Sequence, residues 1–318
     1  MTVAEAWNCC LKLETYFGTH VFLDENIILE AEKVYWPYLL CNVKKRYVGR
    51  MFENSKTLDF TIDTKGVEMK RRDCTLLLKL WMQLVLATIM PDDVTKDVSL
   101  EVTRHDLLSV LINLCVDLIE DKFSMDHYIL SKTAKANYKG KSLPEHMKIY
   151  NLRNKRVSSG ELKVDKYNVG DRVEYIIYHN PNASKVSDKV EDPAYIRQTG
   201  KAIIIDRCHY FKAVRNALGK LICFHIPNYE LLFDAVAGEV MRSQENMNNI
   251  TGYVMVTGTM SPRTRLTKLR PMLLKPIADL PFAKKSKSSA HKSSSSKPKT
   301  KSIASYFKPL NPAFAKHN

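Results

Sequence analysis

The stretch from Ile28 to Tyr47 reads ILEAEKVYWPYLLCNVKKRY and combines a strand-forming segment with a cationic end. Its β-branched and aromatic residues, with the breaker Pro37, predict strands, and the same pattern runs over residues 27–62. The stretch ends on three cations and one aromatic residue: Lys44, Lys45, Arg46 and Tyr47. Lys and Arg neutralise phosphates, and a tyrosine can lie against a sugar or a groove edge, so this end suits a nucleic-acid backbone. A solvated turn is the alternative interpretation.

Several motifs in this chain resemble those of the family B DNA polymerases, in the same order. The stretch above is similar to a palm strand of that family, the Pro-Tyr-Leu-Leu segment after it and the Lys-Lys-Arg-Tyr that follows. The further motifs are Lys65-Gly66-Val67-Glu68 with Arg71-Arg72-Asp73, Ser131-Lys132 with Tyr138, Gly170-Asp171-Arg172-Val173 with Tyr175, Glu191-Asp192-Pro193, and Asp206 with Tyr210 and Phe211. Ordered motifs are far more specific than any single one, and the resemblance covers residues 25–235.

The resemblance implies an α+β fold, with a partial antiparallel palm sheet, then a mainly helical thumb, then a disordered basic tail. We expect the C-terminal part of the palm in 1–72, the thumb in 73–250, an extension in 251–283 and the flexible tail in 284–318. Leucines three and four apart predict two amphipathic thumb helices with packed apolar stripes: Leu76, Leu80 and Leu84, then Leu107, Leu111, Leu114 and Leu118. A strand is expected over 172–179 and a helix over 206–221.

The motifs that hold the two catalytic metal ions in this family, Ser-Leu-Tyr-Pro-Ser and Tyr-Gly-Asp-Thr-Asp, do not occur in the sequence. In-line nucleotidyl transfer needs both metals to clamp the attacking and leaving oxygens. We therefore expect a C-terminal polymerase part that does not extend a primer alone, with Mg²⁺ and the remaining polymerase portion needed for activity. We expect either a truncated piece of a longer polymerase or one half of a split enzyme. The alternative class is a non-catalytic module that binds duplex DNA and a sliding clamp.

Two glutamates could still lie near the chemistry. Glu30 and Glu32 alternate along the predicted strand, which places both on one face. The resemblance implies an accessory, metal-proximal role for both, with Glu32 the candidate metal ligand. An exposed strand face is the alternative.

The resemblance also implies where DNA is held. Lys45 and Tyr47 are similar to residues that touch the minor groove at the primer terminus, where every correct base pair offers acceptors in similar places. The predicted DNA-binding residues are Lys44, Lys45, Arg46, Tyr47, Lys65, Arg71, Arg72, Lys132 and Arg172. Further thumb candidates are Lys135, Lys139, Arg153, Lys155 and Arg156. Taken singly, each could equally be a solvated surface charge.

Composition agrees with a protein that meets a polyanion in a reducing compartment. The chain has 318 residues and a net charge of +15, and residues 284–318 hold nine Lys and no Asp or Glu. The seven Cys are scattered, with no Cys-x-x-Cys pair for zinc. No apolar run reaches the roughly 18 residues of a membrane span. These features predict a nuclear or cytoplasmic replication site without a membrane, and the absent cysteine modules suggest a viral source.

The tail ends in a short apolar motif. After a Lys- and Ser-rich linker, Ile303, Tyr306 and Phe307 recur three and four apart, which places them on one side of a helical turn. They resemble a sliding-clamp-binding peptide, although Thr300 stands where that peptide usually has Gln. The alternative is a chance aromatic pair on an electrostatic DNA tether.

Overall fold

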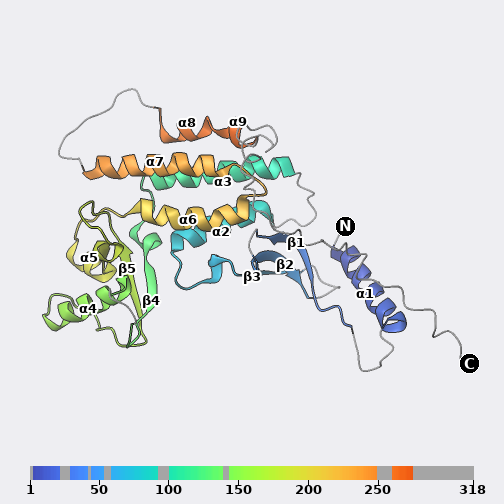
Figure 1. The fold of residues 1–318 in the computed structure, drawn as a ribbon, viewed down its shortest axis with the longest axis horizontal. Helices are drawn as coiled ribbons and strands as arrows, with labels where there is room; N and C mark the ends of the chain where they lie inside the picture. Colours follow the sequence, from blue (N-terminus) through green and yellow to red (C-terminus); the bar gives the residue numbers. More distant parts are fainter. Residues whose placement is uncertain are drawn as a thin grey trace, which may run out of the picture. The chain divides into compact units, whose positions relative to one another are not determined.

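The computed structural model describes residues 3–21, 29–41, 44–53, 59–91, 100–138, 143–248 and 260–274 (Figure 1). The helices are α1 (Val3–His20), α2 (Leu76–Ile89), α3 (Leu100–Ile119), α4 (Glu145–Ser158), α5 (Pro193–Thr199), α6 (Arg207–Ile222), α7 (Tyr229–Asn248), α8 (Pro262–Thr267) and α9 (Arg270–Leu273). The strands are β1 (Val34–Leu40), β2 (Tyr47–Phe52), β3 (Thr61–Lys65), β4 (Leu130–Thr133), β5 (Arg172–Ile177) and β6 (Val190–Glu191). The predicted α+β class is confirmed.

The first sheet has the order β1-β2-β3 and is antiparallel throughout. It confirms the strands predicted in residues 27–62, but β1 begins only at Val34. The pairing of β1 with β2 shifts between Tyr35 and Tyr38, on either side of Pro37. Proline has no N–H to donate to a sheet, so a bulge on an edge strand is where it fits. The cationic turn predicted after this strand connects β1 to β2.

The two helices predicted from the leucine spacing are confirmed as α2 and α3. The stripe predicted for α3 packs as expected, with all four of its leucines buried. The predicted stripe of α2 is wrong, because Leu76 and Leu84 are 53% and 40% exposed. The buried side of α2 instead carries Trp81, Met82 and Val85. Nearly every residue of α2 is apolar, so several stripes fit the helical period and the period alone does not select the buried one.

The second sheet, β4-β5-β6, carries helix α4 against β5 and β6. The strand predicted over 172–179 is confirmed as β5, and the helix over 206–221 as α6. Sequence reasoning missed α4, because most of its residues are polar or charged and few are buried: His146, Met147 and Ile149. Packing against a sheet, rather than its own apolar pattern, stabilises such a helix.

Polar side chains join the helical layers to the second sheet. Arg207, at the start of α6, is fully buried and donates from Nη1 to the Leu118 and Ile119 carbonyls at 2.9 and 2.8 Å. These carbonyls close α3, where a cation offsets the negative end of the helix dipole. The Tyr210 hydroxyl accepts a hydrogen bond from the Ile177 backbone N–H at 2.8 Å. One motif at the start of α6 thus connects α3, α6 and β5.

Residues 260–274 pack on α3 and α7 (Figure 1). Arg265 Nη2 lies 2.6 Å from Glu239 Oε2 of α7, and Arg104 of α3 donates to the Leu274 carbonyl at 2.9 Å. The predicted division of the chain into palm, thumb, extension and tail stays a prediction. Its tail lies outside the described residues. None of the described helices is both long and apolar enough to cross a lipid bilayer.

Candidate nucleic-acid interface

One face of the first sheet carries a cluster of tyrosines, which we call the tyrosine platform: Tyr35, Tyr38 and Tyr47 with Gly49 and Asp63. The three ring centroids lie 5.2 to 5.9 Å apart. Gly49 pairs with Tyr38 on one side and with Asp63 on the other. A Cβ at Gly49 would lie 2.9 Å from both the Tyr35 and the Tyr38 ring, so the missing side chain lets these rings lie over β2.

Asp63 holds two of these tyrosines. Its Oδ2 accepts hydrogen bonds from the Tyr35 hydroxyl at 2.8 Å and from the Tyr47 hydroxyl at 2.9 Å. The Tyr35 and then the Tyr47 hydrogen bond lower the pKa of Asp63, against a smaller effect of burial, so the side chain is a carboxylate at neutral pH. Burial and the bond to Asp63 raise the pKa of Tyr35, which therefore keeps its proton. The platform is thus fixed by charge-assisted hydrogen bonds.

The predicted cations of the β1–β2 turn lie beside this platform, at the start of β2. Lys45 has a positive φ of 61°, which turns the chain sharply. Arg46 Nη1 pairs with Glu68 Oε1 at 2.9 Å, so its charge is used within the protein. Gly66 has φ +68°, and a Cβ there would come within 2.7 Å of the Lys45 carbonyl oxygen. Gly66 therefore allows the end of β3 to approach the turn closely.

A surface pocket of about 450 Å³ brings together four predicted DNA-binding residues from three parts of the chain. We call it the basic pocket. Its lining residues are Arg71, Arg72, Asp73, Ser131, Lys132, Thr133, Lys135, Tyr138, His146 and Arg172. The paired strands β4 and β5, in which Thr133 lies opposite Arg172, form one wall of the pocket. The segment before α2 forms another.

The cations of the basic pocket differ in what they contact. Arg71 makes a two-pronged pair with Asp73, at 3.0 and 2.8 Å. Arg172 Nη2 donates to the carbonyls of Arg72 and Ser131 at 3.0 and 2.8 Å. By contrast Arg72, Lys132 and Lys135 are exposed and form no ion pair with any residue that the structure describes. These three charges are available to a ligand.

The ionisable groups of the basic pocket keep it positive at neutral pH. The Arg71 hydrogen bond lowers the pKa of Asp73, whose charge is then offset by Arg71. Burial, and then the charge of Lys132, lower the pKa of His146, so its ring is neutral. His146 Nε2 lies 2.6 Å from the Tyr138 hydroxyl. The pocket therefore offers lysine and arginine charges against one neutralised carboxylate, which suits a phosphate.

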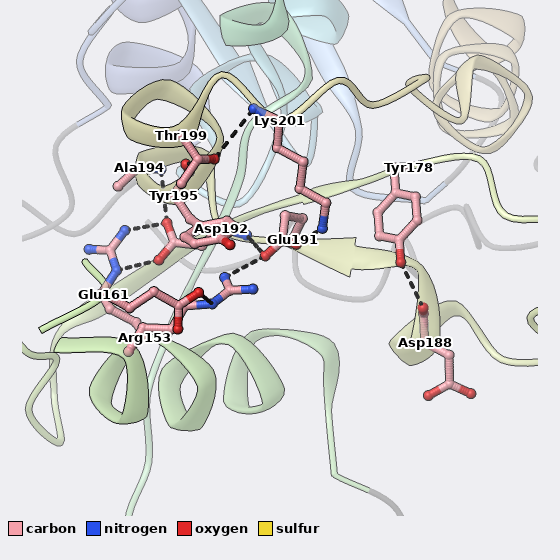
Figure 2. Close-up of polar contacts among 11 residues, drawn as sticks. Arg153, Glu161, Tyr178, Asp188, Glu191, Asp192, Ala194, Tyr195, Thr199 and Lys201 are labelled. Atoms are coloured by element: carbon pink, nitrogen blue, oxygen red, sulfur yellow. Dashed lines mark hydrogen bonds and ion pairs between the residues drawn. The ribbon is translucent and has the colours of Figure 1, made fainter. Parts of the chain in front are cut away.

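Arg153 and Arg156, two of the further thumb candidates, lie instead in a buried ion-pair network (Figure 2). Arg153 binds both oxygens of Asp192 at 2.6 and 2.5 Å, and Arg156 Nη1 lies 2.7 Å from Glu191 Oε1. Lys201 Nζ completes the network at 2.6 Å from Glu191 Oε2. The arginine side chains are only 11% and 12% exposed. Their charges are used inside the protein, and this part of the thumb interpretation needs correction.

Aromatic rings cover the same two arginines. The Arg153 guanidinium lies 4.0 Å from the Tyr167 ring centroid, and that of Arg156 lies 3.5 Å from the Tyr195 ring centroid. Burial would raise the pKa of Glu191, but the hydrogen bonds from Arg156 and Lys201 outweigh it and hold that pKa low. The Glu-Asp-Pro motif is therefore a structural joint: Asp192 also accepts from the Ala194 N–H at 2.9 Å and caps α5.

The structure places Glu30 and Glu32 in exposed, non-strand backbone before β1. The strand predicted to carry them is wrong at this end, because regular pairing of β1 begins at Val34. Among the described residues no three His, Cys, Asp or Glu side chains form a metal-binding group. The glutamates alone do not fit a magnesium site, since Mg²⁺ is held by carboxylates together with substrate phosphates. Their metal-proximal role stays a prediction.

Some predicted residues lie outside the described residues: Lys139, Ile303, Tyr306 and Phe307. Exposed Lys44, Lys65 and Lys155 lie on the described surface but do not line the basic pocket. Sequence reasoning missed Tyr35, Gly49 and Asp63. A signal was present, because two-residue spacing puts Tyr47 and Gly49 on one face of β2. The sequence did not show, however, that β3 pairs with β2 in the register that places Asp63 opposite Gly49.

Comparison with known proteins shows the family. The sequence profile of DNA polymerase family B matches residues 1–223, more than half of this chain. The chain therefore belongs to DNA polymerase family B. The family resemblance seen in the sequence motifs is thus confirmed.

Several curated relatives of this chain are DNA polymerase delta catalytic subunits. That of Plasmodium falciparum is 32% identical over 208 residues, which is 65% of this chain and 17% of the relative. That of Arabidopsis thaliana is 36% identical over 58% of this chain and 15% of the relative. The chain thus spans less than a fifth of the length of these relatives. A solved family B DNA polymerase from Pyrobaculum calidifontis matches with a TM-score of 0.46 and 22% identity, over 66% of this chain and 24% of that chain.

Proposed function

We propose that this chain is a C-terminal part of a replicative, delta-like DNA-directed DNA polymerase, which completes the palm and holds primer–template duplex. The observation that carries the proposal is the basic pocket, where Arg71, Arg72, Lys132 and Arg172 meet although up to 101 positions separate them. Exposed Lys132 and Arg72 supply phosphate contacts, with Lys135 beside them. Work at a site of DNA replication follows from this role.

The tyrosine platform supplies the second half of the interface. Lys45 donates to the acceptors that every base pair presents in the minor groove, and Tyr47 lies against the sugar or groove edge. Lys44, three residues before Tyr47, and Lys65, its cross-strand partner, are exposed and add backbone neutralisation. Contacts of these kinds position a duplex without reading its sequence.

Binding of the purified full chain to a primer–template duplex tests this proposal. We expect binding without sequence preference and an affinity that falls steeply with salt, by about 0.9 in the slope of log K against log salt for each phosphate contact. Duplexes of unrelated sequence serve as the comparison, measured by fluorescence anisotropy. No binding at low salt, or a strong preference for one sequence, would remove the proposed DNA-holding role.

Catalysis by this chain needs residues that it does not contain. We propose that magnesium-dependent nucleotidyl transfer takes place only when the remaining polymerase portion supplies the metal-binding aspartates, and that Glu32, with Glu30 beside it, then lies near the metals. Purified chain should not extend a primed template with nucleotides and Mg²⁺. With the remaining portion added, Glu32→Ala should lower the extension rate more than it lowers DNA affinity. Equal extension rates for Glu32→Ala and the wild type would mean that Glu32 is only an exposed surface residue.

A sliding clamp is a further proposed partner, on the sequence of the tail alone. A peptide of residues 299–310 should bind the cognate clamp through Ile303, Tyr306 and Phe307, as two aromatic anchors in one pocket carry most of such a binding energy. The double change Tyr306→Ala, Phe307→Ala should abolish binding in a pull-down. If the double variant binds equally well and modest salt removes binding, the arm is an electrostatic DNA tether. The alternative class, a non-catalytic module that binds duplex DNA and a clamp, is favoured if the peptide binds the clamp and the remaining polymerase portion does not restore extension.

A further inference from the structure

Asp63 occupies an unusual place for a carboxylate on a surface that meets DNA. It lies on β3 opposite Gly49 of β2 and accepts hydrogen bonds from the hydroxyls of two tyrosines, Tyr35 and Tyr47. Both hydrogen bonds end on the same oxygen, Oδ2. A negative charge facing a phosphate backbone weakens binding unless it does something else there. Its contacts indicate what that is.

We propose that Asp63 is a positioning residue for Tyr47, an inference that rests on the proposed DNA-holding function. The carboxylate accepts the one hydrogen bond that the Tyr47 hydroxyl can donate, which fixes the ring and leaves only the lone pairs of that oxygen for a ligand. Tyr35 donates to the same oxygen from the neighbouring strand and holds the carboxylate in place. DNA then meets an ordered Tyr47 edge, and the entropy of ordering this side chain is lost on folding rather than on binding.

Two ring contacts and one nearby charge support this ordering. The Tyr47 ring lies 5.9 Å from the Tyr35 ring, edge to face, and 5.3 Å from the Tyr38 ring. Tyr38 is 44% exposed, so the platform presents an aromatic surface beside the fixed hydroxyl. Lys70 contributes to lowering the pKa of Asp63 through its charge. The charge of Lys70 thus partly offsets that of Asp63, so the repulsion between Asp63 and the DNA phosphates is small.

The sign of one substitution separates positioning from plain electrostatics. If Asp63 acts only through charge, its removal relieves repulsion, so Asp63→Ala binds DNA more tightly. If Asp63 positions Tyr47, the same change frees the tyrosine and weakens binding about three- to tenfold, the effect expected for one side chain that must be ordered on binding. Asp59→Ala is the matched control, because Asp59 is an exposed carboxylate just before β3 that forms no hydrogen bond or ion pair with the residues described.

The experiment measures duplex affinity of the full chain, by anisotropy, for the wild type, D63A, D63N, D59A, Y47F and the double variant D63A/Y47F. We expect weaker binding for D63A, equal or tighter binding for D59A, and no further loss when D63A is added to Y47F, because the tyrosine hydroxyl is already gone. D63N keeps one oxygen acceptor and should lie between wild type and D63A. Thermal melting of each variant confirms folding, and D63N carries the test if D63A does not fold.

The outcomes distinguish this inference from the proposed function. If the wild type does not bind duplex, both fail. If the wild type binds and D63A or D63N behaves like D59A, Asp63 does not position Tyr47 while DNA holding stands. If D63A weakens Y47F as much as it weakens the wild type, Asp63 acts on another part of the surface and the assignment to Tyr47 is wrong.

Discussion

The basic pocket and the buried ion-pair network both place arginines beside carboxylates, yet they use these charges in opposite ways. In the network the Arg153 and Asp192 side chains are 11% and 0% exposed, and Arg153 donates from Nε and Nη2 to both oxygens of Asp192. In the pocket the equivalent pair, Arg71 with Asp73, is 56% and 38% exposed. Lys132 next to it has no partner among the described residues. A cation is therefore available to a phosphate ligand only where the fold leaves it unpaired.

Burial decides the energetics of the two regions. Pairs at the surface contribute about 0–1 kcal/mol, because water and salt screen them. Breaking a buried pair leaves a charge without its partner, at a cost of about 3–5 kcal/mol. We therefore expect substitutions in the network to act on folding and substitutions in the pocket to act on binding.

The largest expected effect is that of Asp192→Ala. The change leaves the Arg153 guanidinium buried without its carboxylate and removes the cap of α5, so stability should fall by about 3–5 kcal/mol. Chemical unfolding followed by circular dichroism measures this loss. Lys148→Ala is the control on the same helix, α4, because the pair of Lys148 with Asp188 is about half exposed and should contribute at most about 1 kcal/mol. Equal losses for the two would contradict the contrast between the regions.

Glu191→Gln tests the same network through pH. A low folded-state pKa means that ionised Glu191 stabilises the fold above its unfolded-state pKa, about 4.3, and that this contribution is lost as pH falls through the folded-state value. At pH 7 the glutamine variant should be less stable by about 2 kcal/mol, through its weaker hydrogen bonds to two cations. Below pH 4.3 the two stabilities should converge. Parallel profiles down to pH 3 would mean that the pKa of Glu191 is the same in the folded and unfolded states.

Gly49→Ala tests the tyrosine platform. The new methyl would meet two tyrosine rings at 2.9 Å, so the rings or the strand must move, with an expected loss of about 1–2 kcal/mol. The control is Gly18→Ala, where no atom lies within 4 Å of the new methyl. In a helix this second change should be neutral or stabilise by less than about 1 kcal/mol. Thermal melting of both variants measures the difference, and an unaffected Gly49→Ala would show that the platform is loosely packed.

Much of the fold could be predicted because its signals are local. The strands of the first sheet, β5, and helices α2, α3 and α6 all follow apolar periodicity or strand composition in the sequence. The helix α4 could not, since its buried residues are few and the contacts that stabilise it come from β5 and β6. The buried face of α2 could not either, because an almost wholly apolar helix presents several equivalent stripes.

The candidate site was predictable to the extent that its residues lie in ordered motifs. Arg71, Arg72, Lys132 and Arg172 do meet in one pocket. Which cations are paired was not predictable. Arg153 and Arg156 were interpreted as surface charges, because only the fold shows that Glu191, on β6, and the adjacent Asp192 lie beside them. Asp63 was missed for the related reason that a carboxylate in a strand has no meaning until cross-strand register shows that two tyrosines face it.

The smallest expected effect sharpens the comparison from the side of the pocket. Lys132→Ala removes one unpaired charge, so stability should stay within about 0.5 kcal/mol of wild type. Duplex affinity should fall alike for every sequence, and the salt slope should decrease by about 0.9, the contribution of one phosphate. Lys163→Ala is the control, because Lys163 is exposed and does not line the pocket, and its slope should be that of wild type. If both lysines lower the slope equally, DNA is held by general positive charge and the pocket has no special part in the binding.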